Sequence, residues 1–195
     1  MGAGGQVVTF SSGPDRVKGH LARPAGPGPF PVLVVVHEIH GLTEHIRDVA
    51  RRFAAEGYVG LALDLYSREG PPQPQALRDA AARNAFVASL PDRRLVGDVQ
   101  AAAAFLRSLP EVRRDRVGVV GFCMGGTVTL LSACHTPDLA AAVVFYGGRL
   151  IYKEITETKP APHAFFNDAR EFYRPDEARD AWQRTLTFLE KHLRH

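Results

Sequence analysis

The sequence predicts an α/β protein in which a mostly parallel sheet is covered by helices on both faces. Three observations carry this prediction. Four short apolar runs lack polar alternation, which is typical of strands buried on both faces. Segments with the apolar stripe of a helix separate these runs. The 195 residues, 45% hydrophobic and 23% charged, fit one globular domain over residues 1–195 with a single core.

The elements follow in a regular order along the chain. An apolar-rich strand, a Gly-Pro-Asp turn at residues 13–15 and a second strand that ends at Pro24 predict an N-terminal hairpin. The four buried strands are expected at residues 31–36, 59–65, 116–122 and 141–147. Helices are expected at residues 44–56, 75–90, 92–109, 124–133 and 176–193. Thr43 and Asp92 are candidate caps, and Gly57 is a typical helix stop.

Charge and hydropathy exclude two classes of partner. The formal net charge is +3 and the 24 Lys and Arg residues are scattered, so no nucleic-acid footprint is visible. No stretch approaches the roughly 18 apolar residues of a membrane span, and the N-terminus lacks a signal pattern, so we expect a cytoplasmic protein. A helix between Cys123 and Cys134 would separate them by roughly 16 Å, which excludes a disulfide between them. Both thiols are expected to be free.

Cys123 stands in the segment GFCMGG, directly after a buried strand and directly before a helix. A nucleophile on such a strand-turn-helix bend needs small residues two positions before and after it, and Gly121 and Gly125 meet that need. The helix N-terminus is expected to lower the pKa of the thiol, and the N–H of Met124 to face an oxyanion. The alternative is that Cys123 is a small buried apolar residue and the glycines serve helix packing.

The segment HEIHG begins directly after the first buried strand, at the carboxyl edge of the sheet where open α/β sheets gather their sites. The N–H of Ile39 is a candidate second oxyanion donor, and Glu38 is expected near the thiol. A metal site is disfavoured, because H-E-x-H on a loop does not place two imidazoles on one helical face as H-E-x-x-H does. We expect His37, His40 and His45 to be solvated loop residues.

His163 follows two prolines in the segment PAPHAFFND and precedes the terminal helix. A histidine between the last sheet element and the last helix is the general base of hydrolases with this type of nucleophile bend. We therefore expect His163 to take the proton of the Cys123 thiol, in a reaction that requires no metal or organic cofactor.

These motifs resemble those of the dienelactone hydrolase family of α/β hydrolases. The resemblance rests on GFCMGG with H-E-x-x-G ahead of it, and it extends over most of the chain. It implies an α/β-hydrolase-like fold and an enzyme that cleaves a small ester or lactone through an acyl-enzyme, as a carboxymethylenebutenolidase does. It implies Cys123 as nucleophile, His163 as base and Glu38 as the residue that contacts the thiol before substrate binds. Met124 and Ile39 are the implied oxyanion donors.

The sequence departs from the family between Gly148 and His163. The family's catalytic acid, a helix and two strands belong there, and they need roughly 25 to 35 residues. Only 14 residues are present, so we expect the last two strands and the acid to be missing. Three explanations stay open: a segment absent from the given sequence, a natural or engineered deletion, or catalysis by a Cys-His dyad. Glu154 or Glu157 could replace the acid.

A second departure concerns the substrate. Family members hold a substrate carboxylate with arginines, one of them shortly after the catalytic histidine, where this chain has Asn167, Asp168 and then Arg170. Arg78 and Arg83 could face the pocket; the alternative is that both are surface residues. Two other functions stay open, namely a broader carboxylesterase for small esters and a catalytically silent homologue that binds a small ligand.

Overall fold

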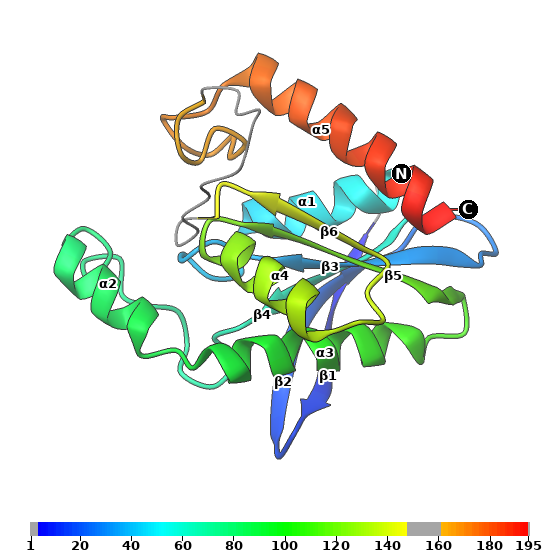
Figure 1. Cartoon of the computed structure of the whole chain (residues 1–195), viewed down its shortest axis with the longest axis horizontal. Coiled ribbons are helices and arrows are strands. Elements are labelled where there is room, and N and C mark those ends of the chain that lie inside the picture. The colour runs from blue at the N-terminus through cyan, green and yellow to red at the C-terminus, as the bar shows by residue number, and fades with distance from the viewer. Residues whose placement is uncertain (1–3, 148–160, 195) are drawn as a thin grey trace.

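A computed structural model describes residues 4–147 and 161–194, which form one sheet between two layers of helices (Figure 1). The strands are β1 (Gly5–Ser12), β2 (Asp15–Ala22), β3 (Phe30–Val36), β4 (Val59–Asp64), β5 (Val112–Phe122) and β6 (Ala141–Phe145). Their order in the sheet is β1-β2-β4-β3-β5-β6. Strands β3 to β6 pair in parallel, and the β1–β2 hairpin joins β4 antiparallel. The predicted mostly parallel sheet with an N-terminal hairpin is confirmed.

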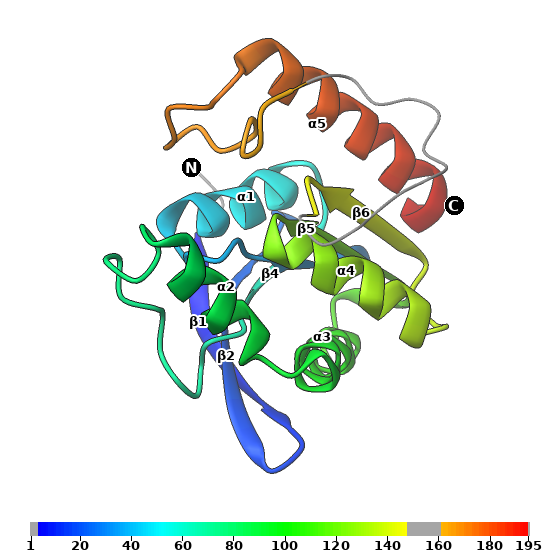
Figure 2. The same cartoon turned by 60° about the vertical axis from the view of Figure 1, so that its left-hand side comes forward.

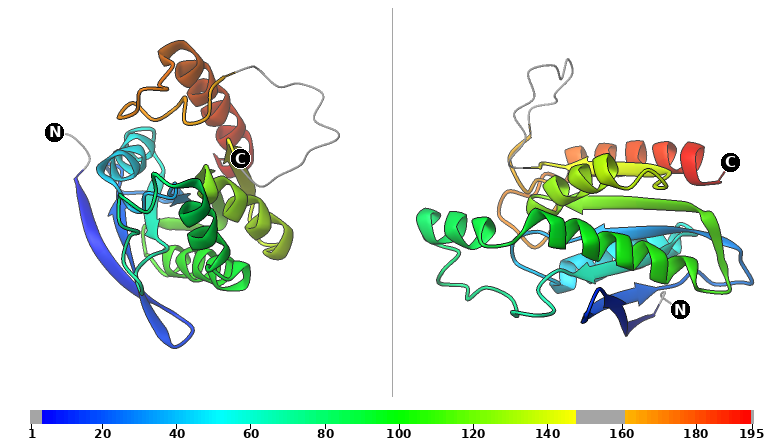
Figure 3. Two further views of the ribbon diagram at one scale, coloured as in Figure 1. Left: turned by 90° about the vertical axis from the view of Figure 1, so that its left-hand side faces the viewer. Right: turned by 60° about the horizontal axis from the view of Figure 1, so that its bottom comes forward.

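The helices divide between the two faces of this sheet (Figures 1 and 2). They are α1 (Glu44–Ala55), α2 (Ala80–Ala88), α3 (Asp92–Arg107), α4 (Met124–His135) and α5 (Pro175–Leu189), and α5 continues into a π-helical turn, η1 (Glu190–Arg194). The helices α1 and α5 pack on one face, and α3 and α4 pack on the other. The hairpin forms the edge of the sheet opposite to β6 (Figure 3).

Strand β3 explains why the buried runs carry no polar alternation. Val32, Val34 and Val36 pack in the core under α3 and α4, whereas Leu33 and Val35 pack in the core under α1 and α5. All five side chains are fully buried. Both faces of the strand therefore select apolar residues, as in other parallel sheets covered on both sides.

The helix ends differ from the predictions in local detail. The helix predicted from residue 75 begins only at Ala80, because the side chain of Asp79 accepts the Ala82 N–H and caps it there. Thr43 precedes α1 but makes no side-chain cap, and Asp92 is the first residue of α3 rather than its cap. Gly57 ends α1 with a φ of 84°, as predicted.

Strand β6 is the last strand of the sheet in the described part of the chain, and it pairs with β5. The predicted loss of two further strands and the two candidate acids, Glu154 and Glu157, fall in residues 148–160, outside the described residues. Both cysteines are free, as predicted. In the two described ranges, we find no helix with the length and apolar character needed to cross a bilayer.

Candidate active site

Cys123 lies on a sharp bend between β5 and α4, with φ 55° and ψ −116°. A non-glycine residue in this region of φ is strained, and such strain is found where the surroundings fix it. A Cβ on Gly121 would lie 2.1 Å from the carbonyl oxygen of Gly125, and a Cβ on Gly125 would lie 2.4 Å from that of Val36. Only glycine fits at both positions. The prediction that these two residues must be small is confirmed.

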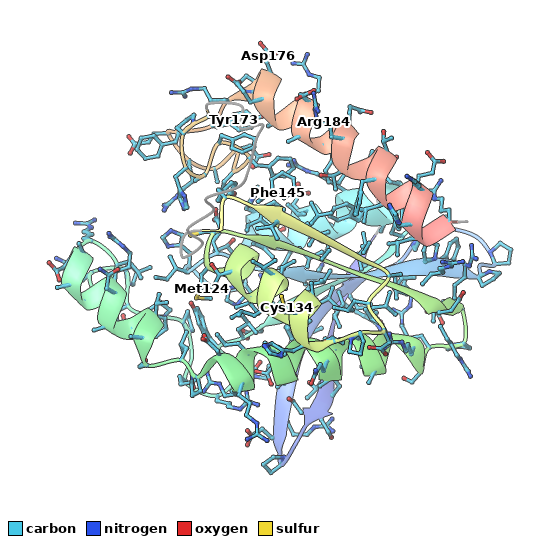
Figure 4. All side chains as sticks on the ribbon, in the orientation of Figure 1. Met124, Cys134, Phe145, Tyr173, Asp176 and Arg184 are labelled. Carbon is cyan, nitrogen blue, oxygen red and sulfur yellow. The ribbon has the colours of Figure 1, made fainter. Side chains whose placement is uncertain are left out.

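The structure brings Cys123 and His163 together across 40 residues of sequence. The Nε2 atom of His163 lies 3.1 Å from the Sγ atom of Cys123, within hydrogen-bond reach of the thiol. His163 belongs to the segment 161–174, called the histidine loop below, which leads into α5. Figure 4 labels Tyr173 in this loop and Met124 at the N-terminal end of α4.

The surroundings of the Cys123 thiol act in opposite directions on its pKa. Burial is the largest influence and raises the pKa, and the negative charge of Glu38 raises it further. The backbone N–H groups of Met124 and Ile39 face the sulfur and lower the pKa, and so does the charge of Arg170. The net pKa lies above the ordinary thiol value. The predicted lowering by the helix N-terminus is therefore wrong, because desolvation outweighs it. The thiol needs a base to become a nucleophile.

Glu38 is buried, and both of its carboxylate oxygens accept hydrogen bonds. Tyr146 donates its hydroxyl to Oε1 over 3.1 Å, and Asn167 donates its Nδ2–H to Oε2 over 2.7 Å. Among the described residues, no hydrogen bond joins Glu38 to the thiol. The influence of Glu38 on Cys123 is that of a nearby charge. The implied contact between Glu38 and the thiol stays a prediction.

The histidines near Glu38 are less exposed than predicted. His37 is fully buried: its Nε2 accepts the N–H of Leu65 over 3.1 Å, and its Nδ1 lies 2.6 Å from the carbonyl oxygen of Glu38. Burial lowers the pKa of His37 and favours the neutral ring. His45 is buried in the first turn of α1, with its Nδ1 3.0 Å from a carboxylate oxygen of Asp168. The prediction of solvated histidines is wrong for both. The ring of His37 pairs with two buried backbone groups, whereas His45 pairs with the exposed Asp168 and its buried Nε2 has no hydrogen-bond partner among the described residues.

A cavity of about 370 Å³ opens beside the sulfur, between α2, α3 and α4. Its wall is mostly apolar, with a few polar side chains: Ile39, Arg83, Asn84, Val87, Ala88, Asp92, Leu95, Cys123, Met124, Thr127 and Val128. Arg83 therefore reaches the pocket, whereas Arg78 is exposed and is not part of this wall. A larger hollow of about 510 Å³ lies along α5 and contains neither Cys123 nor His163.

Two residues of the site carry a role that sequence reasoning did not assign. Tyr146 and Asn167 are the partners of Glu38. A signal for each exists in hindsight: Tyr146 follows β6 at the carboxyl edge of the sheet, and Asn167 comes four residues after His163. The backbone of Tyr146 has a φ of 38°, which is uncommon for a bulky residue. Such an outlier at a strand end points to a residue held in place by its surroundings.

Three comparisons agree on the kind of protein that this chain is similar to. A sequence model of the dienelactone hydrolase family matches residues 17–161. A Bradyrhizobium protein that carries the provisional name 2-oxo-3-(5-oxofuran-2-ylidene)propanoate lactonase is 33% identical over 89% of this chain and 89% of its own. An Escherichia coli K12 protein provisionally named carboxymethylenebutenolidase is 42% identical over 72% of this chain, and the match covers 53% of that protein. This chain thus matches about half the length of that relative.

A solved structure agrees with the fold. The crystal structure of a provisionally named dienelactone hydrolase from Klebsiella pneumoniae superimposes with a TM-score of 0.81 at 29% identity, covering 95% of this chain and 98% of that chain. The sequence alignment with the Bradyrhizobium lactonase is 225 positions long, but it contains 89% of the 195 residues here, or about 174. About 50 of its positions, the difference between 225 and 174, therefore have no residue of this chain opposite them.

Proposed function

The chain belongs to the dienelactone hydrolase family, and on that premise we propose that it hydrolyses a small ester or lactone through an acyl-cysteine intermediate. Cys123 is the nucleophile and His163 is the base. The observation that carries this proposal is the distance of 3.1 Å between Nε2 of His163 and Sγ of Cys123. The sulfur lies on a strained strand-to-helix bend, the kind of turn that presents a nucleophile.

The acylation step begins with proton transfer, because the raised pKa of the half-buried thiol keeps the proton on sulfur. Nε2 of His163 takes that proton, and the sulfur attacks the carbonyl carbon of the ester. The N–H groups of Met124 and Ile39, which face the sulfur, stabilise the negative oxygen that forms next to it. The carbon–oxygen bond then breaks, and the leaving oxygen takes the proton from His163. A thioester on Cys123 remains.

The deacylation step repeats this chemistry with water. His163 takes a proton from a water molecule, whose oxygen attacks the thioester carbonyl, again with its oxygen held by the two N–H groups. The carbon–sulfur bond breaks, the sulfur regains a proton from His163, and the acid leaves. One ester and one water molecule give one acid and one alcohol, or one hydroxy acid from a lactone.

We also propose that the pair works without a carboxylate on Nδ1 of His163. Among the described residues, the hydrogen-bond partner of this imidazole is the sulfur of Cys123 through Nε2. The alignment positions that this chain lacks are in keeping with the absence of a segment that carries the acid in the family. A sulfur nucleophile loses less from a missing acid than a serine hydroxyl does, because its proton is removed far more easily.

The cavity supports a small substrate with a largely apolar acyl group. Its volume of about 370 Å³ is at the lower end of ligand pockets. Arg83 in the pocket wall is the candidate partner for a negative group on the substrate. Arg78, which is exposed, is not needed for this role.

Mass spectrometry during turnover of an aryl ester tests the proposal. We expect wild-type protein to gain the mass of one acyl group, with Cys123 as the modified residue, and to release the phenol in a burst. Cys123→Ala is expected to lose both the burst and the steady state, and Cys134→Ala, which removes the exposed thiol, is the matched control. Equal hydrolysis by wild type and Cys123→Ala would instead indicate the silent homologue that binds a small ligand.

A further inference from the structure

We propose that Glu38 is a positioning residue for His163, and that it works through Tyr146 and Asn167. The three side chains of Glu38, Tyr146 and Asn167 are called the carboxylate clamp below. The inference rests on the proposed pairing of Cys123 with His163, and it goes beyond it by naming what holds the imidazole in place. In this proposal the clamp orients the imidazole in two ways. Tyr146 packs against the ring, and Asn167 fixes the loop that carries it.

The clamp joins three segments that are far apart in sequence. Glu38 follows β3, Tyr146 follows β6, and Asn167 lies in the histidine loop. Each carboxylate oxygen accepts one hydrogen bond, from the Tyr146 hydroxyl at 3.1 Å and from Asn167 Nδ2 at 2.7 Å. Glu38 is only 4% exposed and Asn167 3% exposed, so water does not compete freely for these bonds. Hydrogen bonds to a charged, buried acceptor are among the strong ones in proteins.

Asn167 connects the clamp to His163 through a tightly turned backbone. The N–H of Phe165 donates to the carbonyl oxygen of Pro162 over 3.1 Å, and that of Asn167 donates to the carbonyl oxygen of Ala164 over 3.0 Å. The Oδ1 atom of Asn167 accepts the N–H of Ala169 over 3.1 Å, which fixes the amide with Nδ2 toward Glu38. A shift of Asn167 therefore moves the backbone on which His163 is carried.

Tyr146 connects the clamp to the imidazole itself. Its ring meets the ring of His163 edge to face, with centroids 5.0 Å apart and planes at 64°. The same ring packs on Phe165, the second residue after His163, and on Phe122 at the end of β5. Burial and the charge of Glu38 raise the pKa of Tyr146, so its hydroxyl keeps its proton and donates. The hydrogen bond to Glu38 thus fixes the orientation of the Tyr146 ring, and that ring in turn holds the imidazole of His163.

A second attachment holds the histidine loop when the clamp is broken. The carboxylate of Asp168 pairs with His45 at 3.0 Å and with Arg52, both on α1. Arg170 of the same loop contacts His40. Variants of the clamp are therefore expected to fold, and to misplace the imidazole rather than release the loop.

An exchange of donor and acceptor tests the clamp. Asn167→Asp places a carboxylate against that of Glu38, and the two repel each other once both are ionised. The double variant Glu38→Gln with Asn167→Asp restores the hydrogen bond in the opposite direction, and the carboxylate introduced at position 167 can still accept the N–H of Ala169. The readout is the rate at which iodoacetamide alkylates Cys123 from pH 6 to 9, followed by mass spectrometry with the exposed Cys134 as internal reference.

We expect Asn167→Asp to slow alkylation of Cys123 about tenfold at pH 8, because the two carboxylates repel each other and displace the histidine loop. The double variant is expected to return within about threefold of wild type. Tyr146→Phe, which keeps the ring and removes the hydroxyl, is expected to slow alkylation several-fold. Tyr173→Phe removes a hydroxyl from the same loop outside the clamp, and we expect no change.

Thermal unfolding of each variant shows whether it is folded. Wild-type alkylation rates in folded Asn167→Asp would overturn the inference, and so would a slow double variant that is folded. If Asn167→Asp does not fold, the double variant and Tyr146→Phe decide the matter. Alkylation needs no ester turnover, so this test is separate from that of the proposed function. If the wild type lacks esterase activity but the alkylation rates of the variants follow the expected pattern, the clamp is supported. If the wild type is an active esterase and the clamp variants alkylate at the wild-type rate, the clamp is refuted and the proposed function is not.

Discussion

Replacement of His163 by alanine tests the role of the base through the pH dependence of the thiol. Burial and the charge of Glu38 place the pKa of Cys123 above the ordinary thiol value of about 8.5. At such a pKa less than about 3% of the sulfur is ionised at pH 7, so attack by the sulfur depends on proton transfer. With His163 at 3.1 Å, the proton has an acceptor in place. We therefore expect His163→Ala to react about 100-fold more slowly at pH 7, the lower end of what a positioned general base contributes.

The same reasoning fixes how the defect changes with pH. Thiolate forms as pH rises, so alkylation of Cys123 in His163→Ala is expected to increase about tenfold for each pH unit below the thiol pKa. The wild type is expected to depend on pH less steeply, and the two rates converge above the thiol pKa. The assay is alkylation by iodoacetamide from pH 6 to 10, followed by mass spectrometry. Cys134, which is exposed, serves as an internal reference thiol.

His192→Ala, on η1, is the matched control for the loss of an imidazole. We expect it to follow the wild-type profile throughout. An His163→Ala protein that alkylates Cys123 at the wild-type rate at pH 7 would refute the assignment of His163 as base. A pH profile of equal slope in wild type and His163→Ala would refute it as well, because the imidazole would then take no part in ionisation.

Two further predictions concern the bend and the pocket. Gly125→Ala brings a Cβ within 2.4 Å of the carbonyl oxygen of Val36, so we expect the free energy of unfolding in urea to fall by about 3 kcal/mol or more and esterase activity to be lost. Gly97→Ala, where nothing lies within 4 Å, is the control and should be neutral or stabilising by up to about 1 kcal/mol. Arg83→Ala is expected to raise KM about tenfold for an ester with a carboxylate and to leave a neutral ester unchanged. Arg78→Ala should change neither KM, and a KM for the charged ester that is equal in all three proteins would remove Arg83 from substrate binding.

The sheet and the nucleophile bend could be predicted because their signals are local. The run from Pro31 to Val36 has no polar residue, and the structure buries it on both faces. The spacing of Gly121 and Gly125 around Cys123 reports a backbone contact within the bend itself, between Gly121 and the carbonyl oxygen of Gly125. The approach of His163 to Cys123 follows from the order of elements, because both belong to loops at one edge of the sheet.

The remaining features of the site depend on side chains brought together by the fold. The thiol pKa is set mainly by burial, which no short motif reports. An expectation based only on the N-terminus of α4 therefore predicted a lowered pKa, whereas the pKa is raised. His37 is in a loop segment, yet it is buried because its ring accepts the N–H of Leu65 from the end of the next strand. The pairing of Glu38 with Tyr146 and Asn167 joins residues more than 100 positions apart, for which the sequence has no periodic signal.

The histidine loop is attached to α1 by Asp168 and to Glu38 by Asn167, so its described contacts do not depend on the chain between β6 and the loop. We expect such an arrangement to tolerate insertion and deletion in that stretch, because these contacts hold the imidazole without it. A relative with a longer connection would then keep the same reaction geometry. A graft of a longer relative's connection into this protein would leave the nucleophile and its base where they are and add only what the new segment carries.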